Sequence, residues 1–225
     1  MFPLFETIAI ENGKIKNIAL HQARYERSLI TYYGKSAVTF FNLLDLIQVP
    51  KELHNKLVRC RIDYNAHQTK ILYVEYTPKT HRVFKSIVCN EIDYSLKYAD
   101  RELINTLLAQ KGEADEIIII KEGFVTDCSI GNLAFRNGTQ WFTPNTPLLK
   151  GTQREYLLQS GQLQEIEIRQ EQLEQFDEIQ IIYVLNSKIP FTYLTKSNIS
   201  CAFAKARSVI SLPPSNLARA GTRSS

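Results

Sequence analysis

The sequence predicts an α+β fold made of two subdomains. Strand-like segments surround a single long helical segment at the start of the chain, and the β-branched run Ile117–Ile120 is typical of a buried strand. Short strands and helices alternate after that run, and a junction falls near residues 94–97. We therefore expect an N-terminal α+β subdomain over residues 1–93, a β-rich C-terminal subdomain over 97–194, and a partly disordered tail over 195–225.

The N-terminal part is expected to begin with a hairpin. Asn12-Gly13 is a strong turn signal between strand segments at residues 5–10 and 14–18. Apolar residues then recur at nearly helical spacing, which predicts a helix over 19–33 that ends at Gly34. Further along, the patterns predict a helix over 40–46 and strands over 53–64, 71–76 and 83–90.

The C-terminal part is expected to start with a helix over 98–111, ended by Gly112. The buried strand at 117–120 follows it. Asn137-Gly138 predicts a tight turn between the next two strands, at 133–135 and 140–142. A helix from about Thr152 to 159, a strand over 165–169, a short helix over 171–176 and a strand over 178–185 complete the predicted core.

Composition describes an ordinary globular chain: 44% of the 225 residues are hydrophobic and 22% are charged. The four cysteines lack metal-ligand spacing and form no disulfide framework, so we expect a cytoplasmic protein. Neither a signal peptide nor a membrane span is predicted. Beyond Glu178 the chain is basic without a single acidic residue. A solvated tail explains this better than nucleic-acid binding, because few aromatic residues accompany the charges.

A specific order of short motifs lies between Asp115 and Arg154. It reads V-T-D-C-S-I-G-N-L-A-F, then N-G, T-P and L-K-G-T-Q-R. This order resembles the fold-type-IV pyridoxal-phosphate (PLP) enzymes, the class IV aminotransferase family. Branched-chain and D-amino-acid aminotransferases and aminodeoxychorismate lyases belong to that family. The resemblance covers residues 5–191, and it implies PLP as the cofactor, bound between the two subdomains.

The resemblance implies that Lys97 and Asp127 carry the chemistry. A PLP enzyme needs one lysine that binds the cofactor covalently, and Lys97, in YSLKYADREL, occupies the family's place for it. Taken alone, Lys97 reads as a surface lysine at a helix start. Asp127 stands where the family usually has a glutamate beside the pyridinium nitrogen. Aspartate is one methylene shorter, and its alternative role is to cap a turn.

The same resemblance implies a phosphate site. Arg24, in L-H-Q-A-R, matches an H-x-x-R motif whose arginine holds the PLP phosphate, with two parallel hydrogen bonds expected from its guanidinium. A helix start adds backbone N–H donors at Gly151, Thr152 and Gln153. Asn186 and Ser187, at the end of the last predicted strand, resemble the N-A-x-x-P-V motif of the lyases.

Two arginines are candidates for binding a substrate carboxylate. Arg59 and Arg61 are two residues apart on one predicted strand, so their side chains share a face. We expect one of them, Arg61 slightly ahead of Arg59, to face the substrate. The alternative is an edge strand on which both point into solvent.

Within the family, the chain is most similar to the 4-amino-4-deoxychorismate lyases. That likeness implies conversion of an amino substrate into 4-aminobenzoate and pyruvate for folate biosynthesis. It also implies a homodimer in which each site is completed by the neighbouring subunit. Two alternatives remain: an aminotransferase acting on branched-chain or D-amino acids, and a PLP-binding protein without activity.

Overall fold

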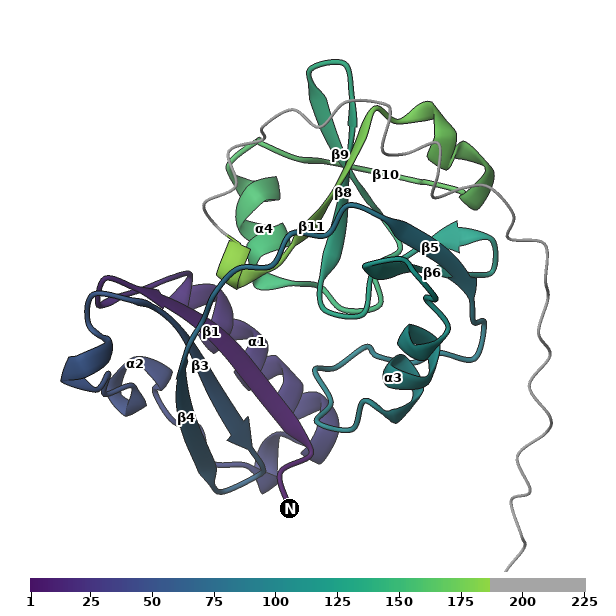
Figure 1. The fold of residues 1–225 in the computed structure, drawn as a ribbon. Coiled ribbons are helices and arrows are strands. Elements are labelled where there is room, and N and C mark those ends of the chain that lie inside the picture. The colour runs from purple at the N-terminus through teal and green to yellow at the C-terminus, as the bar shows by residue number, and fades with distance from the viewer. Residues whose placement is uncertain (187–225) are drawn as a thin grey trace, which may run out of the picture.

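A computed structural model of the protein describes residues 1–186, which form two parts side by side (Figure 1). The predicted tail over 195–225 and Ser187 lie outside the described residues. The described chain contains three β-sheets, one in the N-terminal part and two in the C-terminal part. No helix within residues 1–186 is long and apolar enough to cross a membrane.

The first sheet is antiparallel and has the strand order β2-β1-β3-β4. Asn12 and Gly13 form the turn between β1 and β2 with φ values of 50° and 72°, which confirms the predicted hairpin, since such two-residue turns need positive φ. The strands are β1 (Leu4–Glu11), β2 (Lys14–Ile15), β3 (Leu57–Tyr64) and β4 (Thr69–Glu75).

Helix α1 (Ile18–Tyr33) covers one face of this sheet and ends at Gly34, as predicted. Leu4, Ile8 and Ile10 of β1 pack with Tyr25 and Leu29 of α1 in a buried cluster. Side chains alternate along a strand, so the odd-numbered residues of β1 point to the opposite face of the sheet. That opposite face lines the cleft described below.

Two element boundaries in the N-terminal part differ from the prediction. Helix α2 (Leu43–Leu46) is a single turn and does not begin at residue 40, because the Asn42 side chain accepts a hydrogen bond from Leu44 N and fixes the helix start. Strand β3 begins at Leu57, since the preceding residues form the 3₁₀ turn η2 (Lys51–Leu53).

The C-terminal part contains the other two sheets, with strand orders β5-β6-β7 and β10-β9-β8-β11. An isolated bridge joins Phe124 of β7 to Arg169, in the segment that follows β10. The strands of the two sheets are β5 (Phe84–Val88), β6 (Glu116–Lys121), β7 (Phe124–Val125), β8 (Asn132–Asn137), β9 (Gln140–Pro144), β10 (Gln164–Ile166) and β11 (Glu178–Ile182).

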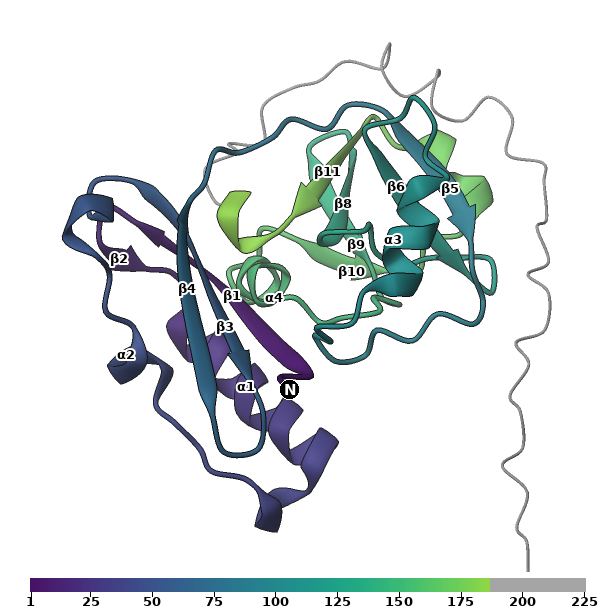
Figure 2. The same ribbon diagram turned by 60° about the horizontal axis from the view of Figure 1, so that its bottom comes forward.

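The sheets do not divide at residues 93–97, where we placed the subdomain boundary. Strand β5 pairs in parallel with β6, so it belongs to the C-terminal part. The chain crosses between the two parts over residues 76–83 (Figure 2). It later returns to the first sheet, where Tyr98 forms a bridge with Leu4 beside β1.

That return shortens the first helix of the C-terminal part. The backbone around Lys97 pairs with β1, with Phe5 N donating to Lys97 O at 3.1 Å and Ala99 N to Pro3 O at 2.7 Å. Consequently α3 (Glu102–Ala109) begins four residues later than predicted. Helix α4 (Thr152–Gln159) begins at the predicted residue.

The remaining boundaries shift by a few residues. Asn137 pairs with Gln140 across the β8–β9 turn, so Gly138 and Thr139 are the turn residues, not Asn137 and Gly138. Strand β10 stops at Ile166, before the end of the predicted strand over 165–169. After it come the 3₁₀ segments η3 (Gln170–Gln175) and, beyond β11, η4 (Val184–Asn186).

Candidate active site

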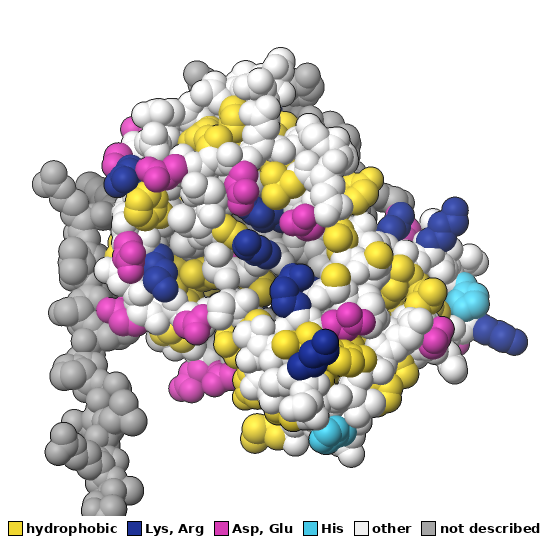
Figure 3. Space-filling model, turned by 180° about the vertical axis from the view of Figure 1, so that it is seen from behind, with side chains coloured by type: hydrophobic (Ala, Val, Ile, Leu, Met, Phe, Trp, Pro, Cys, Tyr) yellow, Lys and Arg dark blue, Asp and Glu magenta, His cyan; other side chains and the backbone are white. Residues whose placement is uncertain are grey.

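A cleft of about 340 Å³ lies between the open face of the first sheet and the C-terminal part. The molecule seen from behind shows Lys and Arg side chains gathered along the seam between the two parts (Figure 3). The cleft brings together eight of the ten predicted site residues, namely Arg24, Arg59, Arg61, Lys97, Asp127, Gly151, Thr152 and Gln153.

Asn186 is not among the residues that line the cleft. Its side-chain Nδ2 donates to Ile181 O at 3.2 Å, so the amide stabilises the turn that follows β11. A role of Asn186 in binding the cofactor stays a prediction.

Lys97 extends into the cleft from the segment that pairs with β1. Its Nζ lies 4.7 Å from the centre of the Phe5 ring. Burial, together with the nearby Arg24, Arg101 and Arg61, lowers the pKa of Lys97 to about 7, and Glu6 opposes this shift without cancelling it. A neutral amine, which is the nucleophilic form, is therefore populated near neutral pH.

Three other lysines of the C-terminal part, Lys85, Lys121 and Lys150, lie outside the cleft. Lys85 Nζ donates to Gln110 O at 2.7 Å, and Lys121 Nζ donates to Ile92 O at 2.9 Å. Neither they nor Lys150 line the cleft, so within residues 1–186 Lys97 is the one lysine in its wall.

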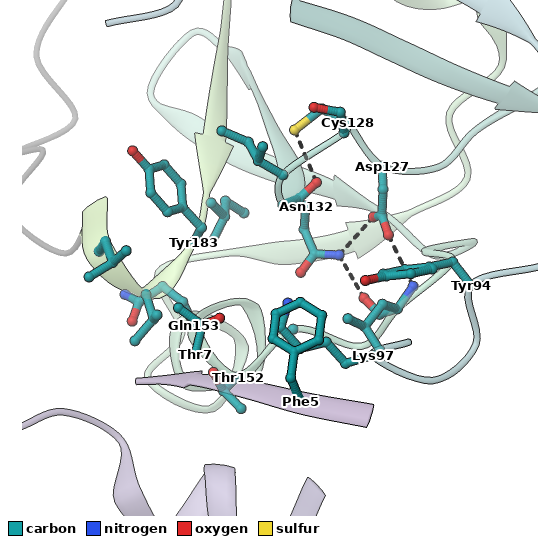
Figure 4. A pocket seen from close by; sticks show the side chains of 18 of the residues that line it. Phe5, Thr7, Tyr94, Lys97, Asp127, Cys128, Asn132, Thr152, Gln153 and Tyr183 are labelled. Atoms are coloured by element: carbon teal, nitrogen blue, oxygen red, sulfur yellow. Dashed lines mark hydrogen bonds between the residues drawn. The ribbon is translucent and has the colours of Figure 1, made fainter. Parts of the chain in front are cut away.

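Asp127 lies in the cleft wall directly after β7. Its Oδ1 accepts a hydrogen bond from Asn132 Nδ2 at 2.7 Å, and its Oδ2 accepts one from Leu149 N at 3.0 Å. Burial raises the pKa of Asp127 to about 6, although these two bonds act in the opposite direction. Figure 4 shows Asp127 and Asn132 on one side of the cleft, across from Phe5 and Lys97.

Position 151 has no room for a side chain, so a glycine is needed there. Its φ of −72° is open to any residue, but a Cβ there would lie 2.1 Å from Asn132 Oδ1. The Asn132 amide cannot simply swing aside, because Nδ2 also donates to Leu149 O at 2.8 Å. The glycine before α4 and the aspartate after β7 are thus coupled through one asparagine.

Arg24 reaches the cleft from α1, but a carboxylate occupies part of its guanidinium. Nε donates to Glu6 Oε1 at 2.8 Å and Nη2 to Glu6 Oε2 at 2.5 Å. Nη1 is directed toward Lys150 O, 3.5 Å away, at the start of α4. Arg24 therefore cannot offer its Nε–Nη2 edge to a phosphate as we expected, and only the side that carries Nη1 faces α4.

Glu6 and His21 extend this ion pair to α4. Burial opposes ionisation of Glu6, yet Arg24 and the hydrogen bond from His21 outweigh it and lower the pKa of Glu6 to about 2. Glu6 Oε2 lies 2.7 Å from His21 Nδ1, and His21 Nε2 lies 3.2 Å from Thr152 Oγ1. Burial lowers the pKa of His21, against the influence of Glu6.

The start of α4 is a place where an anion can bind. Gly151 precedes the helix without a side-chain cap, and Thr152 and Gln153 are buried against the N-terminal part. Asn17 Nδ2 donates to Gln153 Oε1 at 2.8 Å and anchors this turn to α1. The first backbone N–H groups of a helix attract negative charge, and Arg24, although paired with Glu6, directs Nη1 to the same place.

Arg59 and Arg61 both lie on the cleft face of β3, but they differ in their partners. Arg61 is bonded to Asp63 through Nε at 2.9 Å and Nη2 at 2.5 Å, and its guanidinium lies 3.9 Å from the centre of the Phe5 ring. Arg59 has no hydrogen-bond or ion-pair partner in the part of the chain that the structure describes. Arg59, rather than Arg61, is therefore the guanidinium available to a ligand.

Sequence reasoning missed four residues of this site: Glu6, His21, Asn132 and Arg101. Arg101 lines the cleft and donates through Nη2 to Ser129 O at 2.5 Å and through Nη1 to Tyr94 Oη at 3.2 Å. Signals for them were present in the sequence. Glu6 is a lone acid at an inward position of a strand whose other inward residues are apolar, and His21 and Asn132 belong to the H-x-x-R and V-T-D-C-S-I-G-N motifs. Arg101 stands four residues after Lys97, in the K-x-x-x-R pattern of the family.

Comparison with known proteins agrees with the motifs. Residues 94–192 match the family described as amino-transferase class IV. An uncharacterised protein of Haemophilus influenzae is 64% identical over 186 residues, which are 83% of this chain and 99% of that protein. A "putative aminodeoxychorismate lyase" of Schizosaccharomyces pombe is 39% identical over 67 residues, 28% of this chain and 29% of that protein.

A solved structure extends the likeness over both parts of the fold. The crystal structure of a "putative 4-amino-4-deoxychorismate lyase" from Haemophilus somnus is 50% identical, with a TM-score of 0.80. The match covers 83% of this chain and 97% of that one. Identity of this extent, together with the family match and the lysine, aspartate and arginine of the cleft, shows that the chain belongs to the class IV aminotransferase family of PLP-dependent enzymes.

Proposed function

We propose that the protein is a lyase that converts 4-amino-4-deoxychorismate into 4-aminobenzoate and pyruvate. The observation that carries this proposal is the cleft itself. It joins a lysine whose pKa is near 7, a buried carboxylate and several guanidinium groups. The choice of a lyase within the family is supported by the 50% identical protein of Haemophilus somnus and by its name.

The residues of the cleft fit PLP. Lys97 supplies the amine for the aldehyde, and Asp127 supplies an anionic partner for the ring nitrogen. Arg24 Nη1 and the first N–H groups of α4 supply donors for the phosphate. Because residue 151 is a glycine, its backbone lies against the Asn132 side chain, and a larger residue there would displace the amide that is bonded to Asp127. When bound, PLP supplies an electron sink for the substrate's amine carbon.

The chain's own residues provide binding and proton transfer. Lys97, neutral above a pH of about 7, can accept a proton from the substrate carbon and return it. Asn132 and Leu149 N hold the Asp127 carboxylate in one orientation. Holding both catalytic side chains by backbone pairing and hydrogen bonds reduces the reorganisation that the reaction requires.

The charges of the cleft match a dicarboxylate. Arg24 is balanced by Glu6 and Arg61 by Asp63, whereas Arg59 and Arg101 have no acidic partner within residues 1–186. 4-Amino-4-deoxychorismate carries two carboxylates, one for each of these guanidiniums. An aminotransferase that uses 2-oxoglutarate as acceptor would use the same two positions, so the charges support both activities.

A substrate assay distinguishes the two. We expect 4-aminobenzoate and pyruvate to form in equal amounts from 4-amino-4-deoxychorismate with PLP and without any amino acceptor. Transfer of amino groups from branched-chain or D-amino acids to 2-oxoglutarate, with no 4-aminobenzoate formed, would replace the lyase with the aminotransferase. The Lys97→Ala protein should lose either activity, and Lys85→Ala, altered outside the cleft, serves as the matched control.

We further propose that a second copy of the chain covers the open edge of the first sheet. Leu72 and Val74 of β4 pair with Arg61 and Arg59 and share their face, yet they are 51% and 36% exposed. Apolar residues exposed next to a binding cleft are typical of an interface.

We also propose that the protein acts in the cytoplasm. This reducing compartment suits the three buried cysteines of the described chain, which are all free thiols.

A further inference from the structure

A buried chain of hydrogen bonds runs from Arg24 to the first residue of α4, and its direction is fixed as long as His21 is neutral. The Glu6 carboxylate can only accept, so it receives hydrogen bonds from Arg24 and from the Nδ1–H of His21 at 2.7 Å. A neutral imidazole with its proton on Nδ1 must accept at Nε2. The hydroxyl of Thr152, 3.2 Å from that nitrogen, is therefore the donor.

This direction turns the hydroxyl proton of Thr152 away from the cleft. A hydroxyl has one proton, and in this arrangement it lies between Thr152 and His21, so Thr152 presents only lone pairs to the cleft. A phosphate dianion at the start of α4 also presents only lone pairs, and the two would repel each other. A proton on His21 Nε2 reverses the bond: His21 then donates to Thr152, and Thr152 can donate to the phosphate.

We propose that Glu6 and His21 are positioning residues that couple the binding of a phosphate at the start of α4 to the uptake of one proton by His21. The proton comes from solvent and resides on Nε2, and no covalent bond other than this N–H is formed. The inference rests on the proposed placement of the cofactor phosphate, and it assigns a role to two residues that do not contact the reacting atoms.

The charges around His21 support such coupling. Glu6 of β1 faces Nδ1 and favours the imidazolium, whereas Arg24 of α1 and the more distant Lys97 oppose it. Thr152 of α4 faces Nε2 and is neutral. In the free protein burial and the two cations keep His21 neutral at pH 7. A phosphate dianion places negative charge on the α4 side and favours the protonated form.

The test uses pyridoxine 5′-phosphate, which has the phosphate but no aldehyde and so cannot bond to Lys97. Its affinity is measured by calorimetry between pH 6 and 9, in buffers with different protonation enthalpies. Because the ionisation of the ligand and of Lys97 is common to all the proteins, comparison of variants isolates His21. We expect wild-type affinity to fall with pH more steeply than that of His21→Asn, by up to about tenfold per pH unit, the slope that one extra proton gives.

Thr152 provides a second pair of variants that does not alter the buried ion pair. Thr152→Ser keeps a hydroxyl and should retain the wild-type pH profile, whereas Thr152→Val should show the shallow profile of His21→Asn. A purely structural role of His21 would change affinity without changing its pH dependence. Parallel pH profiles in wild type, Thr152→Val and His21→Asn, with pyridoxine 5′-phosphate bound by all three, would overturn the coupling.

Failure of the phosphate site itself gives a different result. Pyridoxine, which lacks the phosphate, should bind wild type much more weakly than pyridoxine 5′-phosphate at every pH. If wild type does not discriminate between the two compounds, the proposed phosphate site is wrong, and the coupling is wrong with it. If discrimination is strong and the profiles are parallel, only the coupling is wrong.

Discussion

Removing Arg24 should destabilise the protein through the carboxylate that remains. Glu6 is fully buried, and Arg24→Ala leaves its charge without the guanidinium. Breaking a buried ion pair in this way costs about 3–5 kcal/mol. The pKa of Glu6 agrees in direction, because it is about 2 against an ordinary 4.5 although burial opposes ionisation.

The pH dependence of this loss has a definite sign. In wild type the folded pKa of Glu6 is below its unfolded value, so its contribution to stability is present above pH 4.5 and is lost as the pH falls toward 2. In Arg24→Ala burial dominates and raises the pKa of Glu6, so stability is lost as the pH rises. Urea unfolding between pH 4 and 8 should show the gap between the two proteins widening with pH. A gap that is constant over this range would refute the reasoning.

A double variant separates stability from cofactor binding. Glu6→Gln with Arg24→Ala removes the buried charge, so it should recover most of the unfolding free energy. It should still bind PLP about 30-fold or more weakly than wild type, because the formal charge at the phosphate is absent. Wild-type affinity for PLP in this double variant would show that Arg24 is a structural ion-pair residue only.

Four other variants test the rest of the cleft and the proposed dimer interface. Gly151→Ala should cost about 1–3 kcal/mol in urea unfolding and weaken PLP binding, because the added Cβ displaces the amide that holds Asp127. Arg59→Ala should raise the KM for the substrate roughly tenfold with little loss of stability. Arg61→Ala should raise this KM less, since Asp63 already balances the charge of Arg61. A larger effect of Arg61→Ala would support our first expectation, that Arg61 faces the substrate. Leu72→Glu should yield a single-chain mass by light scattering where wild type yields two, and a wild-type mass of one chain would contradict the homodimer.

Local patterns in the sequence were enough to predict most of the fold. The Asn12-Gly13 hairpin, the α1 helix ending at Gly34 and the start of α4 at Thr152 follow from turn chemistry and from helical spacing, which act over a few residues. The helix-like pattern after Lys97 was misleading. There, pairing with β1, almost a hundred residues earlier in the chain, competes with helix formation and delays it to Glu102.

Long-range pairing also explains the wrong assignment of strand β5. Strand β5 was assigned to the first part from its position in the chain, but its partner is β6, and no local signal distinguishes an edge strand of one sheet from that of another. The order of the two arginines has a local cause. Arg59 and Arg61 occupy the same face of β3, and Asp63, two residues after Arg61, accepts hydrogen bonds from its guanidinium, which leaves Arg59 available.

The identity of the two main site residues could be predicted from the sequence, whereas their pKa values and partners depend on tertiary contacts. Lys97 and Asp127 were identified from a family resemblance, and the structure places both in one cleft. The lowered pKa of Lys97 arises from burial and from arginines on other elements. Glu6 and His21 become important only because β1, α1 and α4 meet. The meeting of these three elements is a tertiary contact that the spacing of residues in the sequence does not reveal.

The most direct measurement of the central claim is to locate the lysine that bonds to PLP. The protein is incubated with PLP, reduced with borohydride, digested and analysed by mass spectrometry. We predict a pyridoxyl group on Lys97, with a yield that rises with pH through about 7, as the neutral amine forms. Lys97→Arg, which keeps the positive charge, should remain unlabelled. A pyridoxyl group on another lysine of the folded protein, or no label at all, would contradict the assignment of Lys97 as the cofactor-binding residue.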